Sequence, residues 1–304
     1  MSRERQASPG KAGASTHTMF LFLLVCLSLA AREAAHAASG PQRIGTDLYA
    51  CISANDASAN STFLVGEDAI LLVDSGLNAV EAGKCAAEIR RVSPLPIRYV
   101  VNTHYHLDHQ GGNARYEPGA VVITTAWTRQ RTLEMLESTP PHFPNTVVPA
   151  SVTFENSLTI HLAPYTAEVI SAGAGHTLGD AYVYFPEQRA IATGDLFLNG
   201  SCPAMDQGSV KNWIVSLNSF LNRPAEVFVP GHFAVGTRQD VTFFRDYLVD
   251  LMAQVSIMVA AGKTLDEVKA EVKPGRFSTL RQYPKYEATI VDNAEAIYRQ
   301  LHQP

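Results

Sequence analysis

The chain has 304 residues, of which 46% are hydrophobic and 17% are charged, a balance that excludes a disordered or fibrous protein. It suits one large globular domain or a closely fused pair. The net charge is -5 and no lysine- or arginine-rich block is present, so nucleic acid is not an expected partner.

The first residues have the pattern of a secretory signal peptide. Three basic residues stand near the start: Arg3, Arg5 and Lys11. An apolar stretch at 19–31 follows, and then small residues at Ala35 and Ala37, the positions that a signal peptidase reads. We therefore predict a signal peptide at 1–37, cleavage near Ala37, and an exported protein, periplasmic or secreted, with no stable membrane association afterwards. An uncleaved anchor is the alternative, although the stretch is short for a membrane span.

One of the four cysteines, Cys26, lies inside the predicted signal peptide. The other three, Cys51, Cys85 and Cys202, would reach a compartment in which disulfides persist. Cys51 falls on a predicted strand and Cys85 on a predicted helix. A bridge between them and two separate buried thiols both agree with the sequence.

The first half of the chain alternates strands with helices. Residues 47–53 and 61–65 alternate in polarity like strands, whereas 69–73 is a continuous apolar run, typical of a strand covered on both faces. A helix is predicted at 79–92, and a strand at 97–101 follows it.

The middle of the chain contains shorter elements. Strands are predicted at 121–125, 152–154, 158–162 and 168–171, and a hairpin is predicted to join 181–185 to 190–193. A helix begins near Ala126. The proline-rich segment 139–144 is expected to be a rigid, exposed loop.

The last part of the chain is mainly helical. Ser209 can cap a helix that runs to Leu221, and 227–229 is a buried strand. A long amphipathic helix is predicted at 239–260, a shorter one capped by Thr264 runs to Val272, and a last one covers 286–301.

This order predicts an α/β (α+β) protein with an αββα four-layer architecture. Two mixed β-sheets face each other between layers of helices, and the loops that carry polar residues meet at one edge. The expected domain covers 38–304, with a C-terminal helical extension from about 238.

Seven histidine and aspartate residues are candidate metal ligands. Four lie within six positions directly after the strand at 97–101: His104, His106, Asp108 and His109. Three more, His176, Asp195 and His232, stand in loops that border strands. Such a group at strand ends, beside glycines that allow tight turns, indicates a metal site at the sheet edge.

The spacing suggests which residues share an ion. In an extended segment His104 and His106 point to the same side and can bind one ion, which His176 can complete. Asp195 has two oxygens suited to bridging this ion and a second one.

Asp108 and His109 would then turn toward the second ion, with His232 completing its ligands. Imidazole and carboxylate without thiolate favour zinc, two ions per chain, although manganese or iron would suit the same ligands. With a bound hydroxide the centre carries a net charge of about +1, which would favour an anionic or polarised substrate. Asp108 is also the candidate catalytic residue, as a group that positions or relays a proton.

Other polar residues have simpler interpretations. The remaining histidines of the predicted domain, taken singly, are expected to be ordinary residues: His142, His161 and His302. Asp74 ends a buried strand and is expected to support the metal site from behind its ligands. Tyr105 and Asn199 border the site in sequence, and either can be structural.

In order, Asp74, the run from His104 to His109, His176, Asp195 and His232 resemble the five motifs of the metallo-β-lactamase superfamily. The resemblance spans about 45–235 and implies the αββα fold and a dinuclear metal site. Lactamases of the superfamily have a cysteine at the position of Asp195 and a lysine three residues later, where this chain has Leu198. The aspartate is similar to that of glyoxalase II, lactonases and general hydrolases, in which it bridges both metals.

The resulting hypothesis is an exported zinc-dependent hydrolase. A hydroxide bound at two metal ions would attack the carbonyl of a small-molecule lactam, lactone, ester or thioester. Two alternatives remain: a persulfide dioxygenase with one iron, and a non-catalytic metal-binding relay protein. The natural substrate and the oligomeric state do not follow from the sequence.

Overall fold

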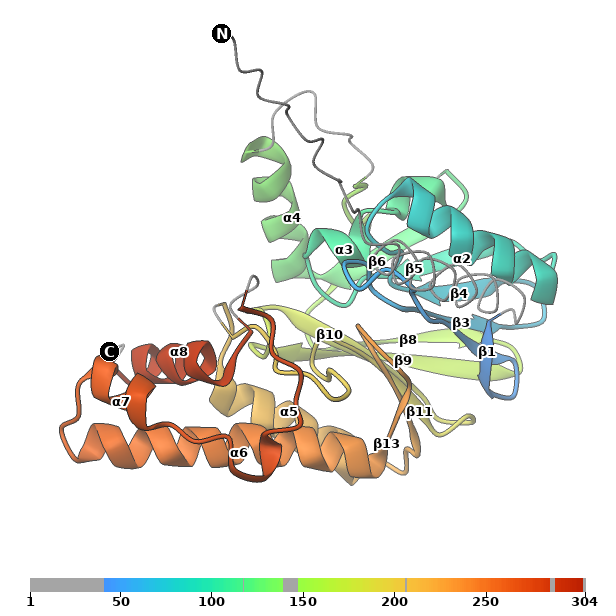
Figure 1. Cartoon of the computed structure of the whole chain (residues 1–304). Coiled ribbons are helices and arrows are strands. Elements are labelled where there is room, and N and C mark those ends of the chain that lie inside the picture. Colours follow the sequence, from blue (N-terminus) through green and yellow to red (C-terminus); the bar gives the residue numbers. More distant parts are fainter. Residues whose placement is uncertain (1–40, 117, 139–146, 206, 285–287, 303–304) are drawn as a thin grey trace, which may run out of the picture. The chain divides into compact units, whose positions relative to one another are not determined.

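Two β-sheets lie face to face between two layers of helices (Figure 1). This computed structural model describes residues 41–116, 118–138, 147–205, 207–284 and 288–302. The predicted signal peptide and the predicted loop at 139–144 lie outside these residues. Within them, no helix has both the length and the apolar character needed to cross a membrane.

The first sheet has seven strands in sequence order: β1 (Gln42–Gly45), β2 (Leu48–Cys51), β3 (Ser61–Val65), β4 (Ile70–Val73), β5 (Ile97–Val101), β6 (Val121–Thr125) and β7 (Val152–Phe154). Neighbours from β1 to β4 are antiparallel, and neighbours from β4 to β7 are parallel. The sheet is therefore mixed, as predicted.

The second sheet has six strands in the order β13-β12-β11-β10-β9-β8. Their bounds are β8 (Ser157–Leu162), β9 (Tyr165–Gly173), β10 (Asp180–Phe185), β11 (Ala190–Gly194), β12 (Val227–Pro230) and β13 (Gly236–Thr237). Only the pair β11 and β12 is parallel. The hairpin predicted between β10 and β11 is confirmed.

Strand β4 explains why the sandwich has four layers. Its side chains alternate between two cores: Leu71 and Val73 face the second sheet, whereas Ile70 and Leu72 face helix α2 (Ala79–Val92). All four residues are buried. A strand with apolar partners on both faces has no polar side, which is what the continuous apolar run predicted.

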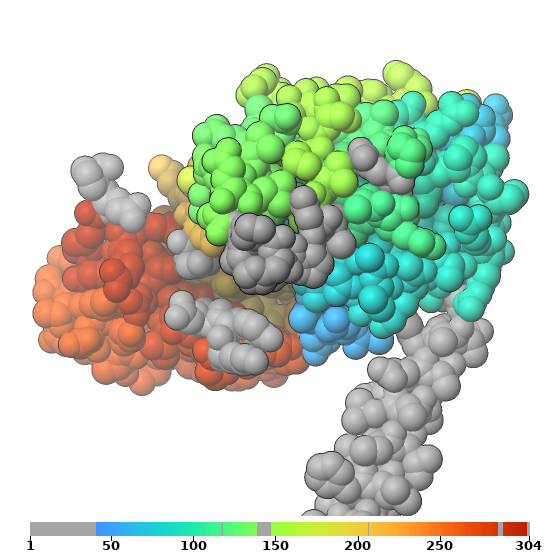
Figure 2. Space-filling model, turned by 90° about the horizontal axis from the view of Figure 1, so that it is seen from above, coloured from blue at the N-terminus to red at the C-terminus, as the bar shows by residue number. Residues whose placement is uncertain are grey.

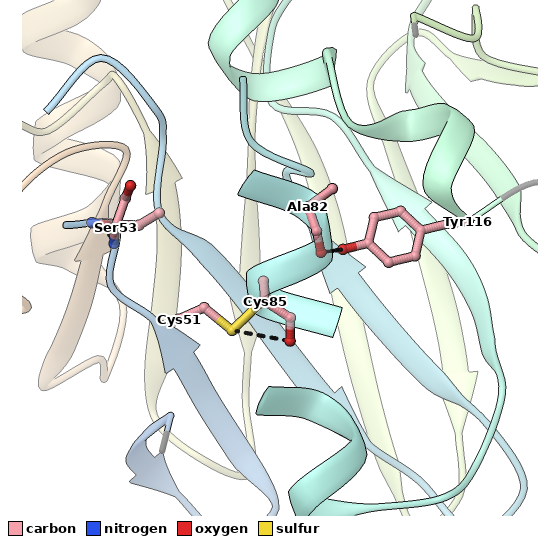
Figure 3. The surroundings of a disulfide bond; sticks show 6 residues. Cys51, Ser53, Ala82, Cys85 and Tyr116 are labelled. Carbon is pink, nitrogen blue, oxygen red and sulfur yellow. Dashed lines mark hydrogen bonds between the residues drawn. A yellow bond between two sulfur atoms is a disulfide. The ribbon is translucent and has the colours of Figure 1, made fainter. Parts of the chain in front are cut away.

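Helix α2 covers the outer face of the first sheet and has the predicted bounds. The side chain of Asn78 caps it by accepting hydrogen bonds from the backbone N–H groups of Val80 and Glu81. A disulfide joins Cys85 on its buried face to Cys51 at the end of β2 (Figure 3). The structure thus decides between the two interpretations of these cysteines, and Cys202 remains a free, buried thiol.

Helices α5 (Val210–Asn222) and α6 (Arg238–Ala260) cover the outer face of the second sheet, and α7 (Leu265–Glu271) and α8 (Ile290–His302) pack with them. Their largest buried side chains include Trp213. The face shown in Figure 2 brings residues of the first half, in blue and blue-green, next to C-terminal residues in orange and red.

The predicted caps of α5 and α7 are confirmed, since the side chains of Ser209 and Thr264 accept hydrogen bonds from the first turns. Helix α8 begins four residues later than predicted because Thr289 caps it, with its side chain accepting from the backbone N–H of Asp292. Strands β1 and β13 and the short helix α3 (Leu107–Gln110) were not predicted. Helix α4 (Ala126–Ser138) begins where expected.

Candidate metal centre

All seven predicted ligand residues lie together at one edge of the sandwich. The run from His104 to His109 follows β5, Asp195 follows β11 and His232 follows β12. His176 precedes β10, which is antiparallel to β11, so its loop lies at the same edge. Carboxyl ends of parallel strands meet at one edge, and that is why residues far apart in the chain converge here.

The first group of candidate ligand atoms consists of His104 Nε2, His106 Nδ1, His176 Nε2 and an oxygen of Asp195. His106 Nδ1 lies 3.0 Å from both His104 Nε2 and His176 Nε2. Asp195 Oδ2 lies 3.5 Å from His176 Nε2.

The second group consists of Asp108, His109 and His232. Asp108 Oδ2 lies 3.0 Å from His232 Nε2 and 3.3 Å from His109 Nε2. The other oxygen of Asp195, Oδ1, lies 3.3 Å from His109 Nε2 and 3.7 Å from His232 Nε2. One carboxylate therefore faces both groups, with one oxygen toward each.

These separations fit metal coordination. Zinc–ligand bonds of about 2.05 Å in a tetrahedron place neighbouring ligand atoms about 3.3 Å apart. The separations given above range from 3.0 to 3.7 Å. Moreover, His109 Nε2 and Asp195 Oδ1 are buried and have no hydrogen-bond partner in the described structure. A cation between them would satisfy both atoms.

The local backbone differs from the extended segment that the spacing suggested. Strand β5 ends at Val101, and His106 is already the N-cap of helix α3. His104 and His106 still converge, but they do so through different ring nitrogens. The turn of α3 directs Asp108 and His109 toward the second group.

Asp74 supports the centre as predicted. Its Oδ1 accepts a hydrogen bond from the Thr103 backbone N–H at 2.8 Å, and its Oδ2 accepts from Thr103 Oγ1 at 2.9 Å. Oδ2 also lies 2.8 Å from His109 Nδ1. An N–H at Nδ1 leaves His109 Nε2 free to face the second group.

In two further histidines, Nδ1, the ring nitrogen that does not face the ligand groups, has a partner that the sequence did not reveal. Thr103 Oγ1 lies 3.1 Å from His104 Nδ1, and the backbone oxygen of Ala204 lies 3.2 Å from His176 Nδ1. A threonine beside the histidine run was the available signal for the first. A backbone oxygen gives no sequence signal at all.

Gly231 is required by the close packing behind Asp195. A Cβ at this position would lie 1.9 Å from Asp195 Oδ1 and 2.9 Å from His109 Cε1. Only glycine therefore lets the chain after β12 pass behind the carboxylate and present His232.

The charges of the centre suit cation binding. Burial would raise the pKa of Asp195, but His109 and His232 hold the pKa well below its usual range. Burial lowers the pKa of His104 well below its ordinary value and that of His176 to about 4. The carboxylate is thus ionised and these two imidazoles are neutral, which are the forms that bind metal ions. Burial would lower the pKa values of His109 and His232, but Asp195 and Asp108 raise both, so a metal ion would displace a proton from each of these two imidazoles.

A pocket of about 390 Å³ opens beside the cluster. Five of the candidate ligands line it: His106, Asp108, His176, Asp195 and His232. The rest of its wall is mostly apolar and includes Leu77 from the first half and Phe233 and Tyr283 from the second. Its size and character suit a small molecule.

The other predicted residues lie outside both ligand groups. His161 and His302 are exposed on β8 and α8, as expected of ordinary residues, and His142 is outside the described residues. The Asn199 side chain donates to the backbone oxygen of Ala234, which is a structural role. The Tyr105 hydroxyl donates to Gln207.

An αββα sandwich that gathers histidines and aspartates at one edge is the arrangement expected of a metal-dependent enzyme. The sequence model of the metallo-beta-lactamase superfamily matches residues 54–232, more than half of the chain. The chain belongs to this superfamily.

Its relatives have diverse activities. It is 30% identical over 129 residues to a hydroxyacylglutathione hydrolase of Synechococcus sp. (strain JA-3-3Ab), covering 41% of this chain and 44% of that protein. It is 25% identical over 171 residues to the alpha subunit of a 2,4-dinitroanisole O-demethylase of Nocardioides sp. (strain JS1661), covering 55% and 50%. The chain thus spans about half the length of these curated relatives.

Solved structures share the fold. The sec-alkylsulfatase Pisa1 from Pseudomonas sp. aligns with a TM-score of 0.71 and 17% identity over 86% of this chain and 50% of that one. A metallo-beta-lactamase from Pontibacter korlensis aligns with a TM-score of 0.59 and 21% identity over 68% and 97%.

Proposed function

We propose that the protein is an exported, zinc-dependent hydrolase of small molecules with a reactive carbonyl: a lactam, lactone, ester or thioester. The observation that carries the proposal is the carboxylate of Asp195, whose two oxygens face two separate groups of ligand atoms. Two zinc ions held there would supply an activated water and polarise the carbonyl oxygen.

In this proposal each group of side chains has a defined task. His104, His106 and His176 would hold one ion, and Asp108, His109 and His232 the other. Asp195 would bridge them. Asp108 also lines the pocket, so its carboxylate can position the attacking water or take its proton.

Thioesters, esters and lactones are the preferred substrates in the proposal. Leu198, which lines the pocket, stands where lactamases with a cysteine ligand have a lysine for the drug's carboxylate. Lactam opening would then be a secondary activity. The hydroxyacylglutathione hydrolases among the relatives support the thioester class.

Export is part of the proposal. The disulfide between Cys51 and Cys85 supports it, because such bonds persist in oxidising compartments and are rare in the cytosol. Mass analysis of the protein recovered from the periplasm or medium would test it. The expected mature chain begins after Ala37, and an intact N-terminus on cytosolic protein would contradict export.

The activity is tested with a substrate panel: a homoserine lactone, a glutathione thioester, a simple ester, a cephalosporin and, as a control, a phosphodiester. Turnover of a carbonyl substrate should disappear with a chelator and return with zinc. His106→Ala should lose zinc and turnover together, whereas His161→Ala, which removes an exposed histidine, should retain both. One iron per chain with oxygen uptake on a persulfide would instead favour the dioxygenase.

A further inference from the structure

The side chain of Gln207 contacts Nε2 of His106, the ring nitrogen that does not belong to the first group. Its Oε1 lies 3.1 Å from His106 Nε2 and 2.5 Å from the hydroxyl of Tyr105, which donates to it. Gln207 belongs to the loop before α5 and is about a hundred residues away in sequence. No sequence pattern connects it with the histidine run.

With the amide of Gln207 in this orientation, the contact requires that Nε2 of His106 carry the proton. A neutral imidazole has one N–H, and an amide oxygen can only accept. When Nε2–H donates to Gln207, Nδ1 keeps its lone pair, which points to the place where His104 Nε2 and His176 Nε2 each lie 3.0 Å away.

The Gln207 amide turned the other way, with its nitrogen toward His106, does not suit the same distances. An amide NH₂ group facing His106 Nε2 would require an acceptor there and would move the proton to Nδ1, among the ligand atoms of the first group. It would also remove the acceptor for the proton of the Tyr105 hydroxyl, which belongs to a buried residue. The network therefore assigns the oxygen, and not the nitrogen, of Gln207 to these two contacts.

Gln207 is exposed, unlike the side chains that contact the outer ring nitrogens of His109 and His104. Asp74 and Thr103, which contact His109 and His104, are buried, whereas Gln207 lies on the surface and lines a second pocket of about 360 Å³. A substitution at Gln207 can therefore remove the contact without disturbing the core.

We propose that Gln207 is a positioning residue for the metal centre, which holds the ring of His106 and its Nε2–H tautomer so that Nδ1 faces the first ion. This inference rests on the proposed function, since it assumes that the first group binds zinc. Tyr105 supports the amide by donating to the same oxygen.

The test compares zinc binding in Gln207→Leu, Gln207→Glu and a matched control, Gln130→Leu. Gln130 lines the same second pocket, but its amide donates to Glu134 and not to a histidine. Zinc affinity is measured by competition with a chromogenic chelator, and folding by thermal melting. Nitrogen NMR of the zinc-loaded protein reports the His106 tautomer.

Gln207→Leu should lower the affinity for one of two zinc equivalents by about 10- to 100-fold. The melting temperature of the metal-free protein should fall by only a few degrees, because the Tyr105 hydroxyl also loses its acceptor. Gln207→Glu, which still offers an acceptor, should retain the affinity within a few-fold, and Gln130→Leu should match the wild type. If the wild type binds two zinc ions and Gln207→Leu binds both equally well, the role of Gln207 is refuted while the proposed function stands. A wild type that binds no zinc refutes both.

Discussion

An oxygen of the Asp74 carboxylate lies 2.8 Å from Nδ1 of His109, although 35 positions separate the two residues in the chain. Asp74 directly follows β4 and His109 lies in the helix after β5, and these two strands are parallel neighbours in the first sheet. The sheet therefore orients a candidate ligand of the second group, His109, through the Asp74 side chain, which does not itself belong to the group.

Replacing Asp74 with alanine should weaken zinc binding and folding together. His109 Nδ1–H and both donors of Thr103 would lose their acceptor, at a cost of about 1–3 kcal/mol for each buried donor left unpaired. Affinity for one zinc equivalent should fall about 10- to 100-fold in chelator competition. Asp68→Ala is the control, since its side chain is 73% exposed. Equal zinc affinities for the two variants would contradict the supporting role of Asp74.

Gly231→Ala should disrupt the centre through the backbone. The new Cβ would lie 1.9 Å from Asp195 Oδ1, so the carboxylate must move. We expect metal analysis to find less than two zinc ions per chain. Gly83→Ala, on helix α2, is the matched control, because a Cβ at that position would have no atom within 4 Å. The alanine should stabilise the helix by about 0.5–1 kcal/mol. Full zinc content in Gly231→Ala would show that Asp195 does not need its present position.

The disulfide should stabilise the fold by constraining the unfolded chain. Cys51 and Cys85 are 34 positions apart, and the chain-entropy relation for a loop of that length gives about 4 kcal/mol. Urea unfolding of wild type with and without reductant should differ by an amount of this order. The double variant Cys51→Ser, Cys85→Ser should be insensitive to reductant. Identical wild-type curves in both conditions would mean that the bond is absent or has no effect on stability.

Cys202 should be an unreactive thiol at neutral pH. Burial raises its pKa to about 11, so the thiolate is formed only as the pH approaches that value. At pH 8 its thiolate fraction is about 200-fold lower than that of an ordinary cysteine. Alkylation of the native protein, followed by peptide mass analysis, should rise steeply toward pH 11 and be fast at pH 8 after unfolding. Rapid alkylation of Cys202 in the native protein at pH 8 would contradict the raised pKa of this thiol.

The sequence predicted the elements whose pattern is strong over several residues. The bounds of α2 and β5 agree with the structure, because a capped amphipathic helix and a short run rich in β-branched and aromatic residues directly after Pro96 are signalled locally. The division of the seven side chains between two groups also agrees, since strand ends at one edge of the sandwich leave little choice of neighbours. The edge strand β1, with the sequence QRIG, has no apolar alternation and was missed.

The features that the sequence did not predict depend on tertiary contacts, which leave no local pattern. Helix α3 has only four residues and directly follows His106, a candidate ligand, so no periodicity signals it. The partner of His106 lies 101 positions away, and a lone glutamine in a loop carries no signal. The pairing of Cys51 with Cys85 depends on how α2 packs on the first sheet, which spacing alone does not determine.

Anomalous X-ray scattering at the zinc edge, on crystals grown with zinc, tests the account most directly. The account predicts two peaks about 3.5–4 Å apart, with Asp195 between them. One peak should lie among His104, His106 and His176, and the other among Asp108, His109 and His232. A single peak, or no peak within reach of these side chains, would contradict the dinuclear centre on which the proposed hydrolysis depends.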